Sequence, residues 1–327
     1  MRKVLYVPLD DRDCNYQFPW LLSQMTEGLE LLRPPYEWMG FLKKPANREK
    51  IWEWLFEQAG ECDYAILSVD TLVYGNIIGS RIHTYSMEEC RETMDRFRQL
   101  KKQNPQLHIH AFNLAARVAA YNDNHEDPEY WQEYGYDIWR YTWLWDKKKR
   151  AEISEKEAEE LESLQKKIPE EIMQDFLERR KTDRFVNLTS VELVRENVFD
   201  ILTVPKDDTA EFGYAALDQM AIMQKAEGEQ LMDRVYCYPG ADEVGSVIFA
   251  RVFCQIKQYQ PVFYVRYSSL TGSSVIPLYE DRPLGESIKW QILSAGGICS
   301  ETPADADCML AVNAPGTCQI ESANQKN

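Results

Sequence analysis

The chain has 327 residues, of which 44% are hydrophobic, and a formal net charge of −16. This length can bury a sizeable core and predicts two domains. The negative charge argues against a nucleic-acid partner, because phosphate binding needs a basic face. The apolar runs are far shorter than the roughly 20 residues that cross a bilayer. We therefore expect a small-molecule ligand and no nucleic-acid or membrane partner.

The N-terminus predicts a cytoplasmic protein. Met1–Lys3 lead directly into the apolar run Val4–Val7, which is too short for the apolar region of a signal peptide. The eight cysteines are scattered and form no CxxC pair. We therefore expect reduced cysteines, most of them buried.

Short apolar runs alternate with helical patterns, which is typical of parallel strands joined by crossover helices. The runs are continuous and not alternating, which predicts strands buried on both faces. The predicted strands are Val4–Leu9, Leu29–Leu32, Tyr64–Val69, Leu107–Phe112, Ile201–Val204, Val235–Tyr238, Val262–Tyr267 and Met309–Val312. The predicted helices are Asn47–Gln58, Met87–Lys102, Ala210–Ala226, Ala241–Ile256 and Leu284–Leu293.

The fold class expected from this order is α/β. We predict a doubly wound parallel sheet over residues 1–258 and a smaller Rossmann-like segment, which need not be complete, over 259–327. A (β/α) barrel is the alternative, because eight strands can be counted if the last two join the same sheet.

A long, charged segment at about 130–183 interrupts this order and predicts a helical insertion in the form of an arm. Its aromatic residues recur every three or four positions, which predicts one buried helix face, with a ligand-stacking platform as the alternative. Pro169 is expected at the first position of a helix within it. We regard the arm as a candidate surface for forming a homo-oligomer.

Polar loops follow four of the predicted strands. Ligands of open α/β sheets bind beyond the carboxyl ends of the strands, so these loops predict a shared site. The substrate-binding candidates are Asp10, Asp11, Arg12 and Asn15 after the first strand, Asp70, Tyr74 and Arg81 after Tyr64–Val69, and Arg251 in the helix after Val235–Tyr238.

The catalytic candidates are carboxylates in the loops after the predicted strands Ile201–Val204 and Val235–Tyr238. They are Asp207, Asp208, Asp242 and Glu243. Neighbouring carboxylates can hold one acid protonated while the other stays ionised, as general acid and base catalysis requires. A structural alternative stays open: Asp208 or Thr209 would cap the following helix, and Asp70 would cap a turn.

Several of these segments together resemble the bacterial DUF4127 family, whose function is unknown. The segments are Val7–Arg12 with Asn15, Asp70 with Tyr74-Gly75 and Ser80-Arg81, Asp207-Asp208 with Phe212-Gly213, and Pro239–Gly245. The resemblance covers nearly the whole chain and implies no reaction. Family members look longer, with a C-terminal Gly-Trp-Asn-Thr-like motif that this sequence lacks, so we expect a chain shorter than typical members.

The first functional hypothesis is a glycosidase-like hydrolase of a sugar or polyol that uses carboxylate chemistry and no cofactor. A second is a hydrolase or isomerase dependent on Mg²⁺, Mn²⁺ or Ca²⁺, with oxygen ligands from Asp10, Asp11, Asp70 and Asp208. The pair His108 and His110 would face one side of a strand, but packed or surface histidines are the simpler interpretation.

A third hypothesis is a non-catalytic protein that binds a small ligand, which requires shape and hydrogen bonds but no carboxylates with opposed pKa values. The sequence contains no GxGxxG, GxxxxGK[ST], GxSxG or HExxH motif, which disfavours nicotinamide, ATP and serine-hydrolase chemistry.

Overall fold

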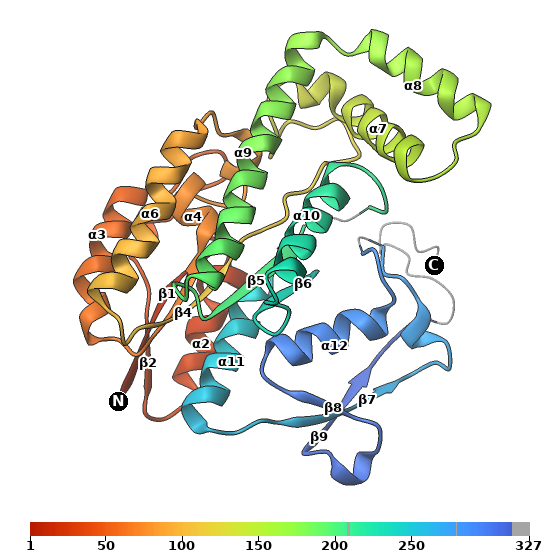
Figure 1. Ribbon diagram of the computed structural model, residues 1–327. Coiled ribbons are helices and arrows are strands. Elements are labelled where there is room, and N and C mark those ends of the chain that lie inside the picture. Colours follow the sequence, from red (N-terminus) through yellow and green to blue (C-terminus); the bar gives the residue numbers. More distant parts are fainter. Residues whose placement is uncertain (208–209, 279, 316–327) are drawn as a thin grey trace.

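The computed structural model describes residues 1–207, 210–278 and 280–315. Its larger sheet is parallel, with the strand order β2-β1-β3-β4-β5-β6 (Figure 1). The strands are β1 (Arg2–Val7), β2 (Leu29–Leu32), β3 (Tyr64–Ser68), β4 (His108–Phe112), β5 (Ile201–Lys206) and β6 (Val235–Pro239). The predicted α/β fold is confirmed, and the strands of the described residues do not close into a barrel.

Both faces of this sheet are covered by helices, which explains the continuous apolar runs of the strands. Successive side chains of a strand point to opposite faces, so Leu5 and Val7 join one core while Val4 and Tyr6 join the other. The first core is closed by α3 (Arg48–Gln58), α4 (Val69–Tyr74), α6 (Met87–Gln103), α9 (Glu170–Arg195) and α10 (Tyr214–Gly228). The second is closed by α2 (Phe18–Gln24) and α11 (Val244–Lys257).

A smaller parallel sheet follows α11, with the order β8-β7-β9. Its elements are β7 (Val262–Tyr267), α12 (Leu284–Ser294), β8 (Ile298–Ser300) and β9 (Cys308–Val312). Helix α12 packs against both β6 and β8, so it joins the two sheets. The succession of β7, α12 and the parallel strand β8 forms a Rossmann-like unit. The division of the chain into two domains at residue 258 stays a prediction. The short elements are α1 (Asp13–Tyr16), α5 (Gly79–Ile82), η1 (Tyr36–Trp38), η2 (Ala59–Glu61), η3 (Gly272–Ser274) and η4 (Pro303–Asp305).

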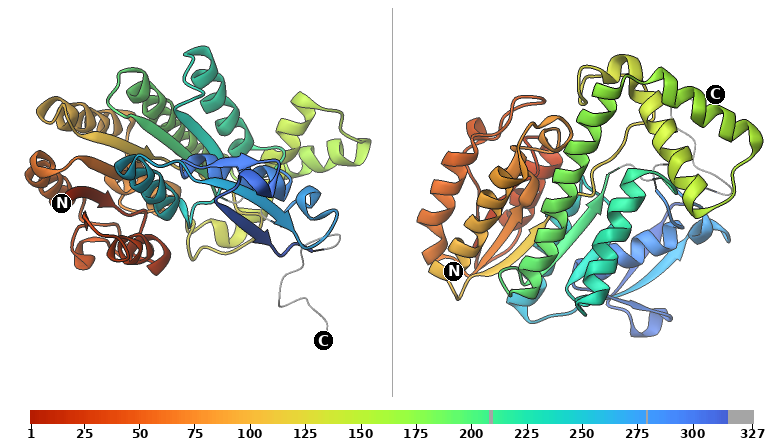
Figure 2. Two further views of the ribbon diagram at one scale, coloured as in Figure 1. Left: turned by 90° about the horizontal axis from the view of Figure 1, so that it is seen from below. Right: turned by 45° about the horizontal axis from the view of Figure 1, so that its top comes forward.

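The insertion between β4 and β5 forms an arm of three helices that projects beyond the sheet (Figures 1 and 2). They are α7 (Trp131–Arg150), α8 (Glu155–Lys167) and α9. Helix α9 runs past the expected end at residue 183, because its second half packs on α6 and α10 over the sheet. The position expected for Pro169 is wrong by one residue: it is the N-cap, with an extended ψ of 139°, and the helix begins at Glu170.

Two helices begin later than predicted, which lengthens the loops at the carboxyl edge of the sheet. Helix α10 starts at Tyr214 and not at Ala210, because its N-cap is Gly213, with a φ of +101° that favours glycine. The expectation that Asp208 or Thr209 caps this helix is therefore wrong, and both residues lie outside the described part of the chain. Helix α11 starts at Val244 and not at Ala241.

No helix among the described residues combines the length and the apolar character needed to cross a membrane. The cysteines at positions 14, 62, 90, 237, 254, 299 and 308 are all free thiols, and three of them, Cys62, Cys90 and Cys237, are buried. Cys318 lies outside the described residues.

Candidate functional site

A cleft of about 210 Å³ opens at the carboxyl edge of the larger sheet. The strand order reverses between β1 and β3, and such a reversal is where ligands of doubly wound sheets bind. Segments that follow β1, β3, β4, β5 and β6 all contribute side chains. The lining residues are Asp10, Asp11, Arg12, Leu42, Asn76, Ile77, Ile78, Arg81, Arg117, Glu126, Asp207 and Asp242.

Half of the twelve candidates from the sequence meet in this cleft. They are Asp10, Asp11, Arg12, Arg81, Asp207 and Asp242. Parallel strands place their carboxyl ends at one edge, so loops far apart in the sequence converge there. The part that each residue plays in function stays a prediction.

Asp10 organises the loop after β1. Its carboxylate accepts hydrogen bonds from the backbone N of Arg12 at 3.0 Å, from Arg12 Nε at 2.9 Å and from Asn15 Nδ2 at 2.9 Å. Arg12 also extends to Asp242, with 2.8 Å between Nη2 and Oδ1. The loops after β1 and β6 are thereby joined across the cleft. Asn15 is fully buried and supports Asp10 from below without lining the cleft.

Arg81 joins two other segments, those that follow β4 and β5. Its Nη1 lies 2.8 Å from Glu126 Oε2 and its Nη2 lies 2.6 Å from Asp207 Oδ2. Glu126 also contacts Arg117 Nη2 at 3.1 Å, and the same nitrogen lies 3.3 Å from Asp127. The Arg81 side chain is only 5% exposed, so its charge depends on these carboxylates. Guanidinium groups and carboxylates therefore alternate around the cleft.

Two candidates after β3 lie inside the protein and not in the cleft. Helix α4 begins directly after β3 with Ser68 as its N-cap, so Asp70 is not the cap. Asp70 instead accepts hydrogen bonds from Leu114 N at 2.9 Å and from Asn113 Nδ2 at 3.3 Å, and burial raises its pKa to about 7. Tyr74 is buried, and its ring stacks on the imidazole of His83 with 4.5 Å between centroids. Both residues shape the core beneath the site.

Two candidates after β6 contact α12 and do not line the cleft. Glu243 Oε1 accepts a hydrogen bond from Gln291 Nε2 at 2.6 Å, and burial raises the pKa of Glu243. Arg251 donates to the backbone oxygens of Leu293 at 2.6 Å and Ser294 at 2.7 Å. Arg251 thus binds the carboxyl end of a helix, where a cation is favoured.

The sequence analysis missed Arg117 and Glu126, which line the cleft from the segment after β4. That segment also follows a predicted strand, so its position at the carboxyl edge was a usable signal. It has no acidic pair or glycine directly after the strand, which are the features that distinguish the other loops.

The metal hypothesis depends on oxygen ligands from Asp10, Asp11, Asp70 and Asp208. Within residues 1–207, 210–278 and 280–315, no group of three His, Cys, Asp or Glu side chains is arranged to hold a metal ion. Asp10 and Asp70 already accept hydrogen bonds from protein donors. Asp208 lies outside the described residues, so a ligand set that includes it stays a prediction.

The two histidines of β4 have separate environments. His108 is exposed, with Nδ1 at 3.1 Å from Asp200 Oδ1. His110 is buried, and burial together with the nearby positive charge of Arg251 lowers its pKa to about 3. This arrangement fits one surface and one packed histidine.

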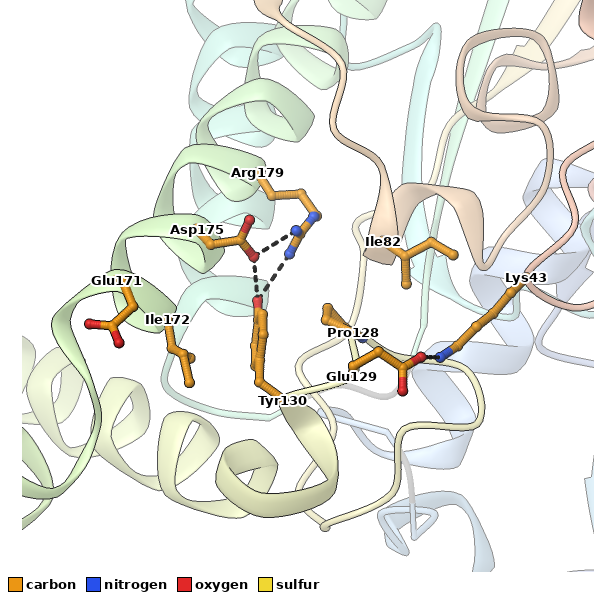
Figure 3. A pocket seen from close by; sticks show the side chains of 9 residues that line it. All are labelled: Lys43, Ile82, Pro128, Glu129, Tyr130, Glu171, Ile172, Asp175 and Arg179. Carbon is orange, nitrogen blue, oxygen red and sulfur yellow. Dashed lines mark hydrogen bonds and ion pairs between the residues drawn. The ribbon is translucent and has the colours of Figure 1, made fainter.

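A second pocket, of about 390 Å³, lies at the base of the arm. Figure 3 shows Tyr130 and Asp175 converging on Arg179, with Lys43 and Glu129 across from them. The Tyr130 hydroxyl donates to Asp175 at 2.8 Å, and Arg179 donates to both, at 3.1 and 2.7 Å. These bonds tie the start of α7 to α9.

Fold and site together define a doubly wound α/β protein with a charged cleft at the strand carboxyl ends. The sequence matches the family described as "Protein of unknown function (DUF4127)" over residues 4–327, so the chain belongs to this family. No curated protein matches the sequence.

Proposed function

We propose that the cleft binds a sugar or polyol and that the protein hydrolyses a glycosidic bond there. The observation that supports this proposal is that Asp207 and Asp242, from the exits of adjacent strands, line the same cleft. The alternating carboxylates and guanidinium groups offer acceptors and donors to neighbouring hydroxyl groups. A neutral ligand also suits a protein with a charge of −16.

The two carboxylates differ in exposure, which suits different roles. The side chain of Asp242 is 60% exposed, as befits a base that activates water, and that of Asp207 is 13% exposed, as befits a nucleophile or a group that orients the sugar. A general acid must keep its proton. Burial raises the pKa of Glu243, which is the direction that a general acid needs, but its carboxylate accepts a hydrogen bond from Gln291 outside the cleft. Asp208 is the other candidate for the acid.

One observation favours a second function, a protein that binds the same ligand without turnover. Asp207 and Asp242 are each paired with an arginine, at 2.6 and 2.8 Å, and both pairs are suited to hydrogen bonding with a ligand. Binding needs no proton-holding partner. Under this second proposal, substitutions in the cleft weaken binding and there is no turnover to lose.

The test is a panel of chromogenic aryl glycosides with the wild type and the variants Asp207→Asn and Asp242→Asn. If either carboxylate takes part in the chemistry, its variant should lose at least about a hundredfold in kcat while remaining folded by circular dichroism. Asp208→Asn and Glu243→Gln test the two candidates for the acid in the same way.

Asp63→Asn is the matched control, because Asp63 is ion-paired with Arg2 at the opposite edge of the sheet. It should leave turnover unchanged. Turnover abolished by EDTA and restored by Mg²⁺, Mn²⁺ or Ca²⁺ would instead support the metal-dependent alternative. No turnover by the wild type on any glycoside would contradict the hydrolase and leave the binding function.

Three further expectations accompany this proposal. The substrate class is carbohydrate, the protein acts in the cytoplasm, and the arm provides the contact of a homo-oligomer. Size-exclusion chromatography with light scattering tests the last of these, since a monomer at all concentrations would contradict it.

A further inference from the structure

The carboxyl-terminal end of α7 in the arm holds the loop that connects β5 to α10 (Figure 1). The carboxylate of Asp146 accepts a hydrogen bond from the backbone N of Gly213 at 2.8 Å. Arg150, one turn further along α7, donates to Asp146 at 2.8 and 2.5 Å and to the backbone oxygen of Glu211 at 2.8 Å. Asp146 is fully buried, so water does not compete for these bonds.

Aromatic contacts strengthen this attachment. The ring of Phe212 meets that of Trp143 edge-on, with 5.2 Å between centroids. The guanidinium of Arg150 lies over the same Phe212 ring at 4.7 Å. Tyr214 stacks on Trp145 at 5.8 Å. Every residue from 211 to 214 is therefore held by a side chain of α7.

The other end of the same loop is Asp207, which lines the cleft. The backbone N of Asp207 donates a hydrogen bond to Ala115 O at 3.5 Å, and its carboxylate forms an ion pair with Arg81. We propose that the arm is a clamp for this loop, and that Asp146 and Arg150 are positioning residues that set the place of Asp207. This inference rests on the proposed function only in taking the cleft as the ligand site.

The arm is fixed firmly enough at its base to act as a clamp. Arg179 of α9 donates to the backbone oxygen of His83 at 2.9 Å, which ties the arm to the segment after α5. The same side chain holds Tyr130 and Asp175 in the pocket of Figure 3. Helix α9 then continues onto the sheet without a break. The arm is therefore joined to the sheet through α9 and to the loop through the end of α7.

The test is hydrogen–deuterium exchange of the unliganded, full-length chain, read by mass spectrometry at the amides of Gly213 and Asp207. Arg150→Gln removes the bonds to Asp146 and Glu211 from a partly exposed position, and Asp146→Asn removes the charge while keeping the side-chain shape. We expect exchange at both amides to accelerate roughly tenfold in each variant relative to the amides of the larger sheet, because the lost bonds are charge-assisted.

Lys167→Gln is the matched control in the arm, since Lys167 of α8 is paired with Asp137 of α7 at 2.7 Å, more than two turns before Asp146. It should leave exchange at both amides unchanged. Equal exchange in Arg150→Gln and Lys167→Gln would overturn the clamp. Faster exchange at Gly213 without a change at Asp207 would overturn the positioning of Asp207.

This experiment does not depend on the proposed reaction. If an aryl glycoside is hydrolysed, kcat in Arg150→Gln should also fall by about tenfold, because Asp207 is displaced from its productive position. If no glycoside is hydrolysed, the proposed hydrolase fails while the exchange result still decides whether the clamp exists.

Discussion

Replacing Arg81 with glutamine should lower the free energy of unfolding by about 3 kcal/mol, because removing one partner of a buried ion pair leaves the others uncompensated. The Arg81 side chain is 5% exposed and is held between Glu126 and Asp207. Glutamine is shorter and neutral, so it cannot satisfy both carboxylates. The loss should appear as a lower urea midpoint with an unchanged slope.

Arg96→Gln is the control for this prediction. Arg96 makes an equally well-formed pair with Glu49, at 3.0 and 2.8 Å, but the two side chains are 33% and 66% exposed. Exposed pairs contribute up to about 1 kcal/mol, so this variant should be nearly as stable as the wild type. If Arg81→Gln cost no more than Arg96→Gln, the network around the cleft would not support the fold.

The location of the cleft could be predicted from the sequence because it depends on topology. Continuous apolar runs such as Tyr64–Ser68 identify strands buried on both faces, and parallel strands bring the loops after them to one edge. Asp10, Asp207 and Asp242 follow three different strands and reach the same cleft for this reason.

The direction of individual side chains could not be predicted, because it depends on where each helix begins. The strand exit at Asp70 also carries a carboxylate, yet α4 starts at Val69 and turns this carboxylate towards the backbone after β4. The partners of Arg251 are carbonyl groups at the end of α12, which no local pattern in α11 reveals.

The buried position of Asp70 should make the stability of the protein fall as the pH rises. Its pKa is raised to about 7 in the folded protein, by burial and by the nearby charge of Asp183, whereas an aspartate in the unfolded chain has a pKa of roughly 4. Between these two values the folded protein retains a proton that the unfolded chain releases. The free energy of unfolding therefore decreases with rising pH across this window, and above it Asp70 adds no further pH dependence.

The variant Asp70→Asn isolates this effect, since it keeps an oxygen acceptor for the backbone N of Leu114 but does not titrate. Other ionisable groups are common to both proteins, so the difference in unfolding free energy between wild type and variant reports on Asp70. From pH 4 to pH 7 the wild type should lose up to about 4 kcal/mol of unfolding free energy relative to the variant. The difference should then stay constant at higher pH. Urea titrations at a series of pH values measure it. A difference that does not depend on pH would mean that Asp70 ionises as readily in the fold as in the unfolded chain, despite its burial and its position beneath the cleft.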